Sequence, residues 1–284
     1  MPELVAIVTD STSDIDPDQA RVLSVTVVPL FINFGDRRQL DRVELSRAEF
    51  YRKLETEPVL PTTSQPTAQA FTDAFEPYAA AGRPIVCITI SQKLSGTINA
   101  ARAGAQALPG ANVELVDSAT TCSGLMLQVV RAAELARGGA GVETIKAALL
   151  ADRATQHGYA TLPDLKYVAR TGRLGKAQAV FGSLLKIVPV LAFREGEVAE
   201  ESRVRTFSRA QDSMIEAVVR DVGNDSSARI AVAHANAPQL GQAVAEKLAA
   251  KLRRSPSEFM LVEAGPAIAV HAGPGAVGIF CVAG

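Results

Sequence analysis

Cysteine and histidine are scarce in this chain, which limits the metal and redox chemistry available to it. Among 284 residues there are three histidines and three cysteines, which are Cys87, Cys122 and Cys281. No two cysteines have the short spacing of a metal motif, and no group of histidines, cysteines and carboxylates has ligand spacing. Two of the cysteines stand in apolar runs. We therefore expect buried, reduced thiols and no metal site.

Excess charge and long apolar segments are lacking as well. The formal net charge is −1, from 29 basic and 30 acidic residues, which gives no electrostatic reason to expect nucleic-acid binding. The first residues include Glu3 and Asp10 without a long apolar run, so we expect no signal peptide, no membrane span and a cytoplasmic location. The hydrophobic residues, 48% of the chain, are sufficient for one large or two medium domains.

The stretch from residue 85 to residue 101 predicts a strand, a hydroxyl-rich turn and a helix. A run of β-formers follows Pro84, Ser95-Gly96-Thr97 interrupts it, and an alanine-rich segment suited to a helix begins at Asn99. Open α/β sheets bind ligands at the carboxyl ends of their strands. The start of a helix adds free N–H groups and a positive end. This turn is therefore suited to bind an anion.

Strand and helix patterns alternate through the first half of the chain, which predicts a mostly parallel α/β sheet. Pro29 inside one strand pattern indicates an edge or irregular strand, and Ser46 with Glu49 fits a capping box. A polar loop is expected at 61–67. The expected strands are 4–9, 25–34, 85–90 and 113–116, and the expected helices are 44–54, 68–81, 124–137 and 142–154.

The second half is less regular and suits an α+β domain. We place the boundary near residue 155, which gives an α/β domain at 1–155 and an α+β domain at 156–284. The expected helices are 164–169, 175–184, 209–222 and 240–253, and the expected strands are 186–193, 198–206, 230–234, 259–262 and 277–282.

Three short motifs match nucleotide-binding or hydrolase patterns only as text. The glycines of 273–278 precede a strand instead of opening a helix, so they do not form a dinucleotide site. Segment 172–176 has short glycine spacing and is followed by Ala177, where a phosphate loop needs a hydroxyl. Ser95 has Lys93 and Thr97 in place of the two glycines of a nucleophile elbow.

Hydroxyl side chains in two turns remain as the candidate site. Thr62, Thr63 and Ser64 stand in one turn, Ser95 and Thr97 in another, and His271 lies beside the last glycine-rich turn. Serine and threonine also cap helices and close turns without any further function. From the residues alone, both interpretations stay open.

Several motifs in order along the whole chain resemble the DegV family. The opening segment 8–14 is also similar to the start of that family. The motifs are Pro61-Thr62-Thr63-Ser64-Gln65-Pro66, Leu94-Ser95-Gly96-Thr97-Ile98-Asn99-Ala100-Ala101, Val116-Asp117-Ser118, Arg170-Thr171-Gly172-Arg173-Leu174 and His271-Ala272-Gly273-Pro274-Gly275.

The resemblance implies two domains with a long-chain fatty acid, such as palmitate, between them. It implies a lipid-binding carrier that is not itself an enzyme and needs no cofactor. Its partner would be a fatty acid kinase that phosphorylates the bound carboxylate to an acyl phosphate for phospholipid synthesis. Transient contact with a membrane is compatible with this role.

Residue by residue, the resemblance assigns the carboxylate to Thr63 and Ser95, with His271 joining the network and Gly96 and Thr97 beside it. This sequence departs from the family pattern at Ile98, where an aromatic residue is common, and at Ala272, where a small hydroxyl residue is common. These two differences bear on which chain length or unsaturation fits. Basic positions near the pocket mouth or a kinase-docking face are assigned to Arg170, Arg173, Lys176 and Arg205.

Physical chemistry is consistent with this assignment. Hydroxyls, an imidazole and turn N–H groups can satisfy a carboxylate, and burying that group unpaired would cost several kcal/mol. At roughly 0.8 kcal/mol per buried CH₂, a sixteen-carbon tail contributes on the order of 10 kcal/mol before ordering costs. Such a tail needs an apolar slot, and we expect half or more of the candidate slot residues to be ordinary core residues instead. The candidates are Phe181, Leu184, Leu185, Ile187, Val188, Val190, Leu191 and Phe193.

Two other functions fit the same residues. A serine-dependent acyl hydrolase or transferase would use Ser95 as nucleophile and His271 as base. A small-anion sensor that regulates a partner would use the same turns without an acyl slot.

Overall fold

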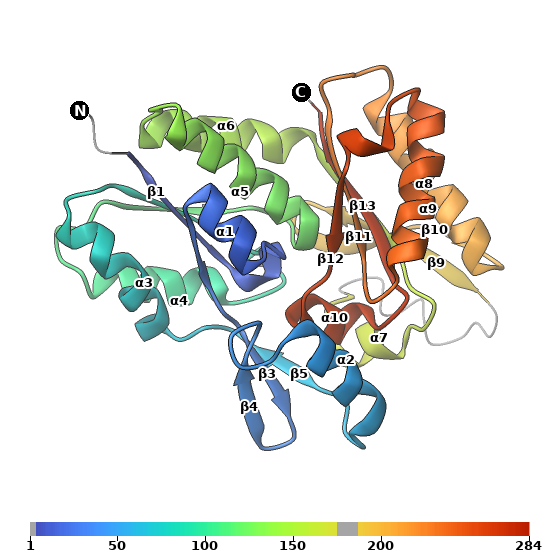
Figure 1. The fold of residues 1–284 in the computed structure, drawn as a ribbon, viewed down its shortest axis with the longest axis horizontal. Coiled ribbons are helices and arrows are strands. Elements are labelled where there is room, and N and C mark those ends of the chain that lie inside the picture. Colours follow the sequence, from blue (N-terminus) through green and yellow to red (C-terminus); the bar gives the residue numbers. More distant parts are fainter. Residues whose placement is uncertain (1–3, 175–186, 284) are drawn as a thin grey trace.

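The described residues form three β-sheets, and the first of them is parallel and contains the strand that precedes the hydroxyl-rich turn (Figure 1). The computed structural model describes residues 4–174 and 187–283. Every neighbouring pair in this sheet is parallel, which confirms the predicted parallel α/β arrangement. In order, the strands are β2 (Val25–Val28), β1 (Ala6–Asp10), β6 (Ile85–Thr89) and β7 (Val113–Asp117).

Helices cover both faces of this sheet (Figure 1). Helices α3 (Ala68–Ala80) and α4 (Thr97–Gln106) pack on one face, and α1 (Pro17–Leu23) and α5 (Cys122–Arg137) on the other. The strand β6 alternates accordingly, since Ile85 and Cys87 face the first pair of helices while Val86 and Ile88 face α5. The sheet is therefore buried on both sides, as its continuous apolar runs predict.

The second sheet is mixed and lies in the C-terminal half. Only the pair β11–β12 is parallel, and the other neighbours are antiparallel. Helices α8 (Phe207–Val222) and α9 (Pro238–Leu252) cover its outer face. The strands in order are β10 (Glu197–Val204), β9 (Val188–Arg194), β8 (Gln156–Thr161), β13 (Val277–Val282), β11 (Arg229–His234) and β12 (Met260–Glu263).

Helix α5 lies between the two large sheets and is buried on nearly all sides. Eleven of its sixteen residues are buried. It shares one core with Ile7 and Val86 of the first sheet and with Ala231 and Phe280 of the second. The following helix, α6 (Val142–Thr155), packs beside it. The two sheets are thus joined through a helical layer (Figure 1).

The third sheet is small and antiparallel, and it is formed by residues from the first half of the chain. It consists of β4 (Arg37–Leu40), β3 (Phe31–Phe34) and β5 (Thr62–Ser64), with α2 (Arg47–Thr56) between β4 and β5 in sequence. Its core includes Phe34 and Phe50 together with Leu162 and Val270 of the C-terminal half. The division at residue 155 stays a prediction, but residues 31–64 pack with the part of the chain that follows it.

Several predicted elements need correction. The single strand expected at 25–34 is two strands in different sheets, because Pro29 has no N–H to donate to a ladder and residues 29–30 belong to neither strand. The expected loop 61–67 contains the strand β5. The sequence patterns did not indicate α1, β4, β8, the short helix α10 (Pro266–Ala272) or the 3₁₀ turns Ser11–Ser13 and Pro256–Glu258. The helix expected at 175–184 lies outside the described residues.

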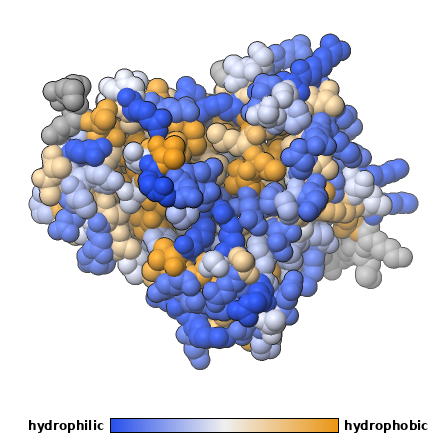
Figure 2. Space-filling model, in the orientation of Figure 1, coloured by the Kyte–Doolittle hydropathy of each residue, from blue (hydrophilic) through white to orange (hydrophobic). Residues whose placement is uncertain are grey.

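Large hydrophobic side chains are exposed on several elements of the described chain. On the face shown in Figure 2, hydrophilic residues predominate over the part formed by the third sheet and α2. Large exposed hydrophobic side chains include Val22 on α1, Val43 before α2, and Met260 and Leu261 on β12. Across residues 4–174 and 187–283, no helix has the length and hydrophobicity needed to cross a bilayer.

Candidate functional site

A cavity of about 610 Å³ lies where the three sheets approach one another. It is bordered by the turn after β6, by β5, by α10 and by residues of β9, β11 and β13. This volume falls within the roughly 300–1,000 Å³ that is usual for small-molecule pockets. Of the predicted candidates, Thr63, Ser95, Gly96 and His271 line it, although they come from three different parts of the chain, whereas the buried Thr97 does not.

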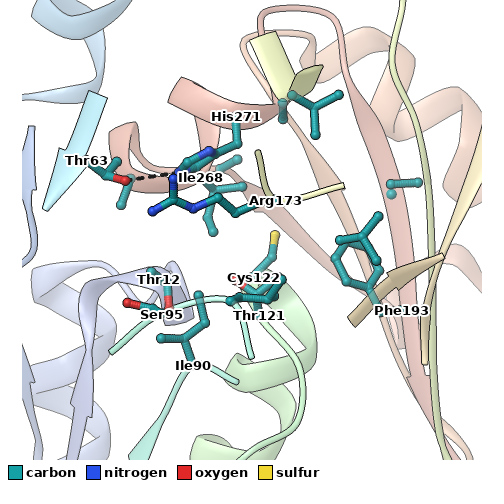
Figure 3. A pocket seen from close by; sticks show the side chains of 18 of the residues that line it. Thr12, Thr63, Ile90, Ser95, Thr121, Cys122, Arg173, Phe193, Ile268 and His271 are labelled. Carbon is teal, nitrogen blue, oxygen red and sulfur yellow. Dashed lines mark hydrogen bonds between the residues drawn. The ribbon is translucent and has the colours of Figure 1, made fainter. Parts of the chain in front are cut away.

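Hydroxyls and an imidazole form one end of the cavity (Figure 3). Thr63 Oγ1 and His271 Nε2 are 3.1 Å apart and hydrogen-bonded. At the same end, across the cavity from this pair, Ser95 Oγ is hydrogen-bonded to Thr97 Oγ1 at 2.9 Å. Thr97 is the first residue of α4 and Gly96 is its N-cap, with no side chain capping the helix. This end can therefore supply hydroxyls and the N–H groups of a helix start to an acceptor.

His271 is neutral in this environment. Burial, together with the nearby charges of Arg173 and Arg170, lowers the pKa of its imidazole to about 3. It sits near the end of α10, where Gly273 has a φ of +73°. A neutral imidazole can exchange hydrogen bonds with Thr63 and a ligand, but it is a weak base at pH 7.

The hydrolase interpretation loses support from this geometry. Ser95 is bonded to Thr97, and His271 is bonded to Thr63. A nucleophile needs a base within hydrogen-bond reach whose pKa lies near the working pH. A histidine with a pKa of about 3 does not meet the second condition.

Buried polar contacts hold the turn that carries Ser95. The Asp10 carboxylate accepts hydrogen bonds from the backbone N–H groups of Thr12 and Ile90, at 2.9 and 2.8 Å. Ser91 Oγ donates to the carbonyl of Gly196 at 2.7 Å, which attaches the turn to the β9–β10 hairpin. Gly196 has a φ of +82°, and a Cβ there would meet Ser91 Oγ at 2.4 Å. The close contact therefore depends on this glycine.

The opposite end of the cavity is apolar, and strand alternation decides which residues of β9 reach it. Leu191 and Phe193 line the cavity. Val188 and Val190 instead pack under α8 and α9. The ring of Phe193 lies 5.1 Å from that of Phe280 on β13. Of the other predicted slot residues, Ile187 does not border the cavity, and Phe181, Leu184 and Leu185 lie outside the described residues.

The predicted basic positions have different surroundings. Arg173 lines the cavity, and Figure 3 shows its side chain reaching toward His271. Arg170, on α7 (Lys166–Thr171), does not line it and donates to the backbone carbonyls of Leu60 and Pro61. Arg205 is exposed after β10 and also does not line the cavity. Lys176 lies outside the described residues.

Sequence reasoning missed several residues that line the cavity, because they are ordinary in their local context. Thr12 follows β1, Cys122 opens α5 and Ile268 lies on α10. Gln65 reaches the turn because residue 96 is glycine, since a Cβ there would lie 2.2 Å from Gln65 Oε1. The alternation of the strand 277–282 was the signal that would have indicated Phe280.

All three cysteines are buried and free, as expected from the sequence. Burial raises the pKa of the Cys87 and Cys122 thiols well above the ordinary value. Within the described part of the chain, no three histidine, cysteine or carboxylate side chains gather in a way that could hold a metal ion.

Comparison with known proteins places the chain in a family. A family model described as the uncharacterised DegV family matches residues 4–284. The chain belongs to the DegV family. One DegV-domain protein, from Halalkalibacterium halodurans, is 38% identical over 281 residues, and the match covers 97% of each chain. The DegV protein of Bacillus subtilis is 31% identical over 276 residues, with 97% of this chain and 98% of that protein covered.

Solved structures of DegV proteins and of one further fatty-acid-binding protein share the whole fold. A fatty-acid-binding DegV protein from Thermus thermophilus matches with a TM-score of 0.89 and 32% identity, covering 98% of this chain and 99% of that chain. The B. subtilis DegV structure, described as a fatty acid binding protein, matches with a TM-score of 0.89 and 30% identity over 99% of both chains. A stearic-acid-binding protein from Eubacterium ventriosum matches with a TM-score of 0.91 and 25% identity over 98% of both chains.

Proposed function

We propose that this DegV protein binds a long-chain fatty acid in the 610 Å³ cavity and presents its carboxylate to a fatty acid kinase. The observation that carries the proposal is the polarity of the cavity. Thr63, Ser95 and His271 stand at one end, while Phe193 stands at the other. An alkyl chain with a single acidic head group has this distribution of polarity.

The head group would be held by neutral donors. A carboxylate offers about four lone-pair sites, and the hydroxyls of Thr63 and Ser95, the imidazole of His271 and the first N–H groups of α4 can fill them. Because the carboxylate keeps its charge, these hydrogen bonds are charge-assisted and stronger than those between neutral groups. Arg173 at the cavity edge adds a cation without a buried ion pair.

The tail would supply most of the affinity. Its carbons would run past Ile268 and Cys122 toward Phe193 (Figure 3). A sixteen-carbon acid such as palmitate then contributes on the order of 10 kcal/mol before ordering costs. The fatty-acid-binding relatives from T. thermophilus and B. subtilis, at 32% and 30% identity, support this class of ligand.

Phosphorylation by a partner fits the position of the head group. Gln92, Lys93 and Arg173 line the cavity near the hydroxyls and are exposed, so the carboxylate lies near the surface. In the partner's reaction a carboxylate oxygen attacks the γ-phosphorus of ATP, the bond to the bridging oxygen breaks, and acyl phosphate and ADP form. The protein itself contributes binding and orientation, in the cytoplasm. Arg173 and Arg205 are our candidates for the docking face.

The first test is the identity of the bound lipid. Organic extraction of the purified protein followed by mass spectrometry should yield a long-chain acid in about equimolar amount. Recovering none, together with no uptake of added palmitate or oleate by delipidated protein, would refute the proposal. Added kinase and ATP should then convert the bound acid to acyl phosphate. Failure of that step alone would remove the kinase partnership and leave the carrier.

The second test removes the head-group donors. The double variant Thr63→Ala, Ser95→Ala should bind palmitate more weakly by at least about 100-fold, since each hydrogen bond to a charged group contributes roughly 1.5–3 kcal/mol. Thr62→Ala is the matched control, because Thr62 is exposed on the same strand and does not line the cavity. Equal affinities for the double variant and the unmutated protein, by calorimetry, would exclude these hydroxyls from the site.

A further inference from the structure

Arg170 lies in the last turn of α7, on the surface of the C-terminal half, but its guanidinium is hydrogen-bonded to another part of the chain. Nη1 donates to the carbonyl of Leu60 at 2.9 Å, and Nη2 donates to the carbonyl of Pro61. These two carbonyls directly precede β5. One rigid fork therefore fixes two successive peptide units at the point where the chain enters the strand that carries Thr63.

Few other contacts define the position of β5: its pairing with β3, the hydrogen bonds that Asn33 Nδ2 donates to Ser64 Oγ and Thr62 Oγ1 at 2.8 and 3.4 Å, and the bond between Thr63 and His271. This strand is three residues long and lies at the edge of its sheet, paired only with β3. Its register places Thr63 opposite Ile32. A short edge strand with a single neighbour has few ladder hydrogen bonds, so contacts from outside the sheet contribute much of its order.

Arg170 completes a set of contacts in which α7, α10 and β5 each contact the other two. Helix α7 packs against α10. Thr63 on β5 bonds to His271 on α10 at 3.1 Å. Arg170 supplies the third contact, from α7 to the start of β5. Without the hydrogen bonds from Arg170, Thr63 is held by its own hydrogen bond to His271 and by the pairing of β5 with β3.

We infer that Arg170 is a positioning residue for fatty-acid binding, which holds Thr63 against His271 by fixing the backbone at residues 60 and 61. It acts through Thr63 and does not touch the ligand. Its charge also helps to keep the His271 imidazole neutral, because Arg170 is among the groups that lower the pKa of His271. Arg170 influences ligand affinity only if the proposed function holds, so the experiment includes one readout that needs no ligand.

A double-mutant cycle tests this role. Arg170→Gln should weaken palmitate binding about tenfold, equivalent to ~1.4 kcal/mol, in the unmutated background. The same change should cost less than about twofold in the Thr63→Ala background, because the residue that it positions is already gone. Arg170→Lys, which can reach one carbonyl as a point donor, should lie between. Lys166→Gln is the matched control on the same helix, since Lys166 pairs with Asp164 instead.

Hydrogen exchange of the ligand-free protein gives the independent readout. Peptides that cover residues 60–65 should exchange faster in Arg170→Gln, or in Arg170→Lys where glutamine prevents folding, and should be unchanged in Lys166→Gln. Unchanged exchange together with equal losses of affinity in both backgrounds would overturn the inference. So would unchanged palmitate affinity with a raised KM of the kinase for the loaded protein, which would assign Arg170 to docking. If the unmutated protein binds no fatty acid, the exchange result still decides the positioning role.

Discussion

Burial determines what His271 can do. An exposed histidine has a pKa near 6.5 and exchanges protons at neutral pH, whereas burial and two arginines hold the pKa of this one at about 3. It therefore stays an uncharged hydrogen-bonding group through the physiological range. That property suits a carrier better than a general base, and it follows from the position of α10 under the third sheet.

The pH dependence of stability should reveal this histidine. Its pKa is lower in the folded protein than in the unfolded chain, so the unfolded chain takes up the proton first, and stability falls as pH drops from about 6.5 toward 3. Denaturant titrations of delipidated protein between pH 7 and 4 should show a steeper loss of unfolding free energy in the unmutated protein than in His271→Asn. The buried carboxyls Asp10, Asp14 and Asp41 are common to both proteins, so their titration largely cancels. Identical slopes would contradict a buried neutral imidazole.

Individual site residues could be predicted unevenly from the sequence. Thr63, Ser95 and His271 belong to motifs that the family resemblance identifies, and the structure places them around one cavity. The contact from Arg170 to Leu60 and Pro61 joins residues that are 110 and 109 positions apart. No local pattern marks such a pair, because the acceptors are backbone carbonyls and any residue type supplies those.

At the scale of elements, alternation along β9 separates ligand contacts from core contacts. Leu191 borders the cavity, and its neighbour Val190 lies fully buried under α8 and α9. We expect Leu191→Ala to change the relative affinities for fatty acids of different length, because it widens the slot. Val190→Ala should lower stability by about 1–3 kcal/mol and leave those relative affinities unchanged. Competition binding with acids of increasing length measures the first effect and urea denaturation the second. The same selectivity in both variants would be inconsistent with this arrangement.

Elements with strong local patterns were predictable, and those that depend on distant partners were not. The apolar runs at 85–90 and 277–282 and the amphipathic segment at 209–222 gave strands and a helix close to the observed bounds. Strands β4 and β5 are largely polar, and they exist because β3 pairs with both. Helix α10 is short and largely apolar, so it shows no polar face to mark it.

At the scale of the whole molecule, the cavity lies between the first sheet, the third sheet and α10, so a bound ligand should contact all three and stabilise their arrangement. A ligand between the first sheet, the third sheet and α10 stabilises the folded state by an amount that grows with the logarithm of its free concentration once that concentration exceeds its Kd. At a free concentration 100 times its Kd, a fatty acid should add about 2.7 kcal/mol to the unfolding free energy. Delipidation should therefore lower Tm, and added palmitate should restore it in the unmutated protein but much less in Thr63→Ala, Ser95→Ala. A Tm that does not respond to palmitate would argue against a site at this junction.

Helix α5 belongs to the first half of the chain, yet its far side is sealed by β11 and β13. A Cβ at Gly124 on this helix would lie 2.9 Å from the ring of Phe280, so the packing leaves no spare room. Expressed alone, residues 1–155 would expose the hydrophobic far side of α5 to water. Residues 156–284 would in turn lose the helix surface that covers Phe280. Recombination of either half with an unrelated domain would therefore need a substitute helix of the same shape. We expect the two halves to have evolved together for this reason.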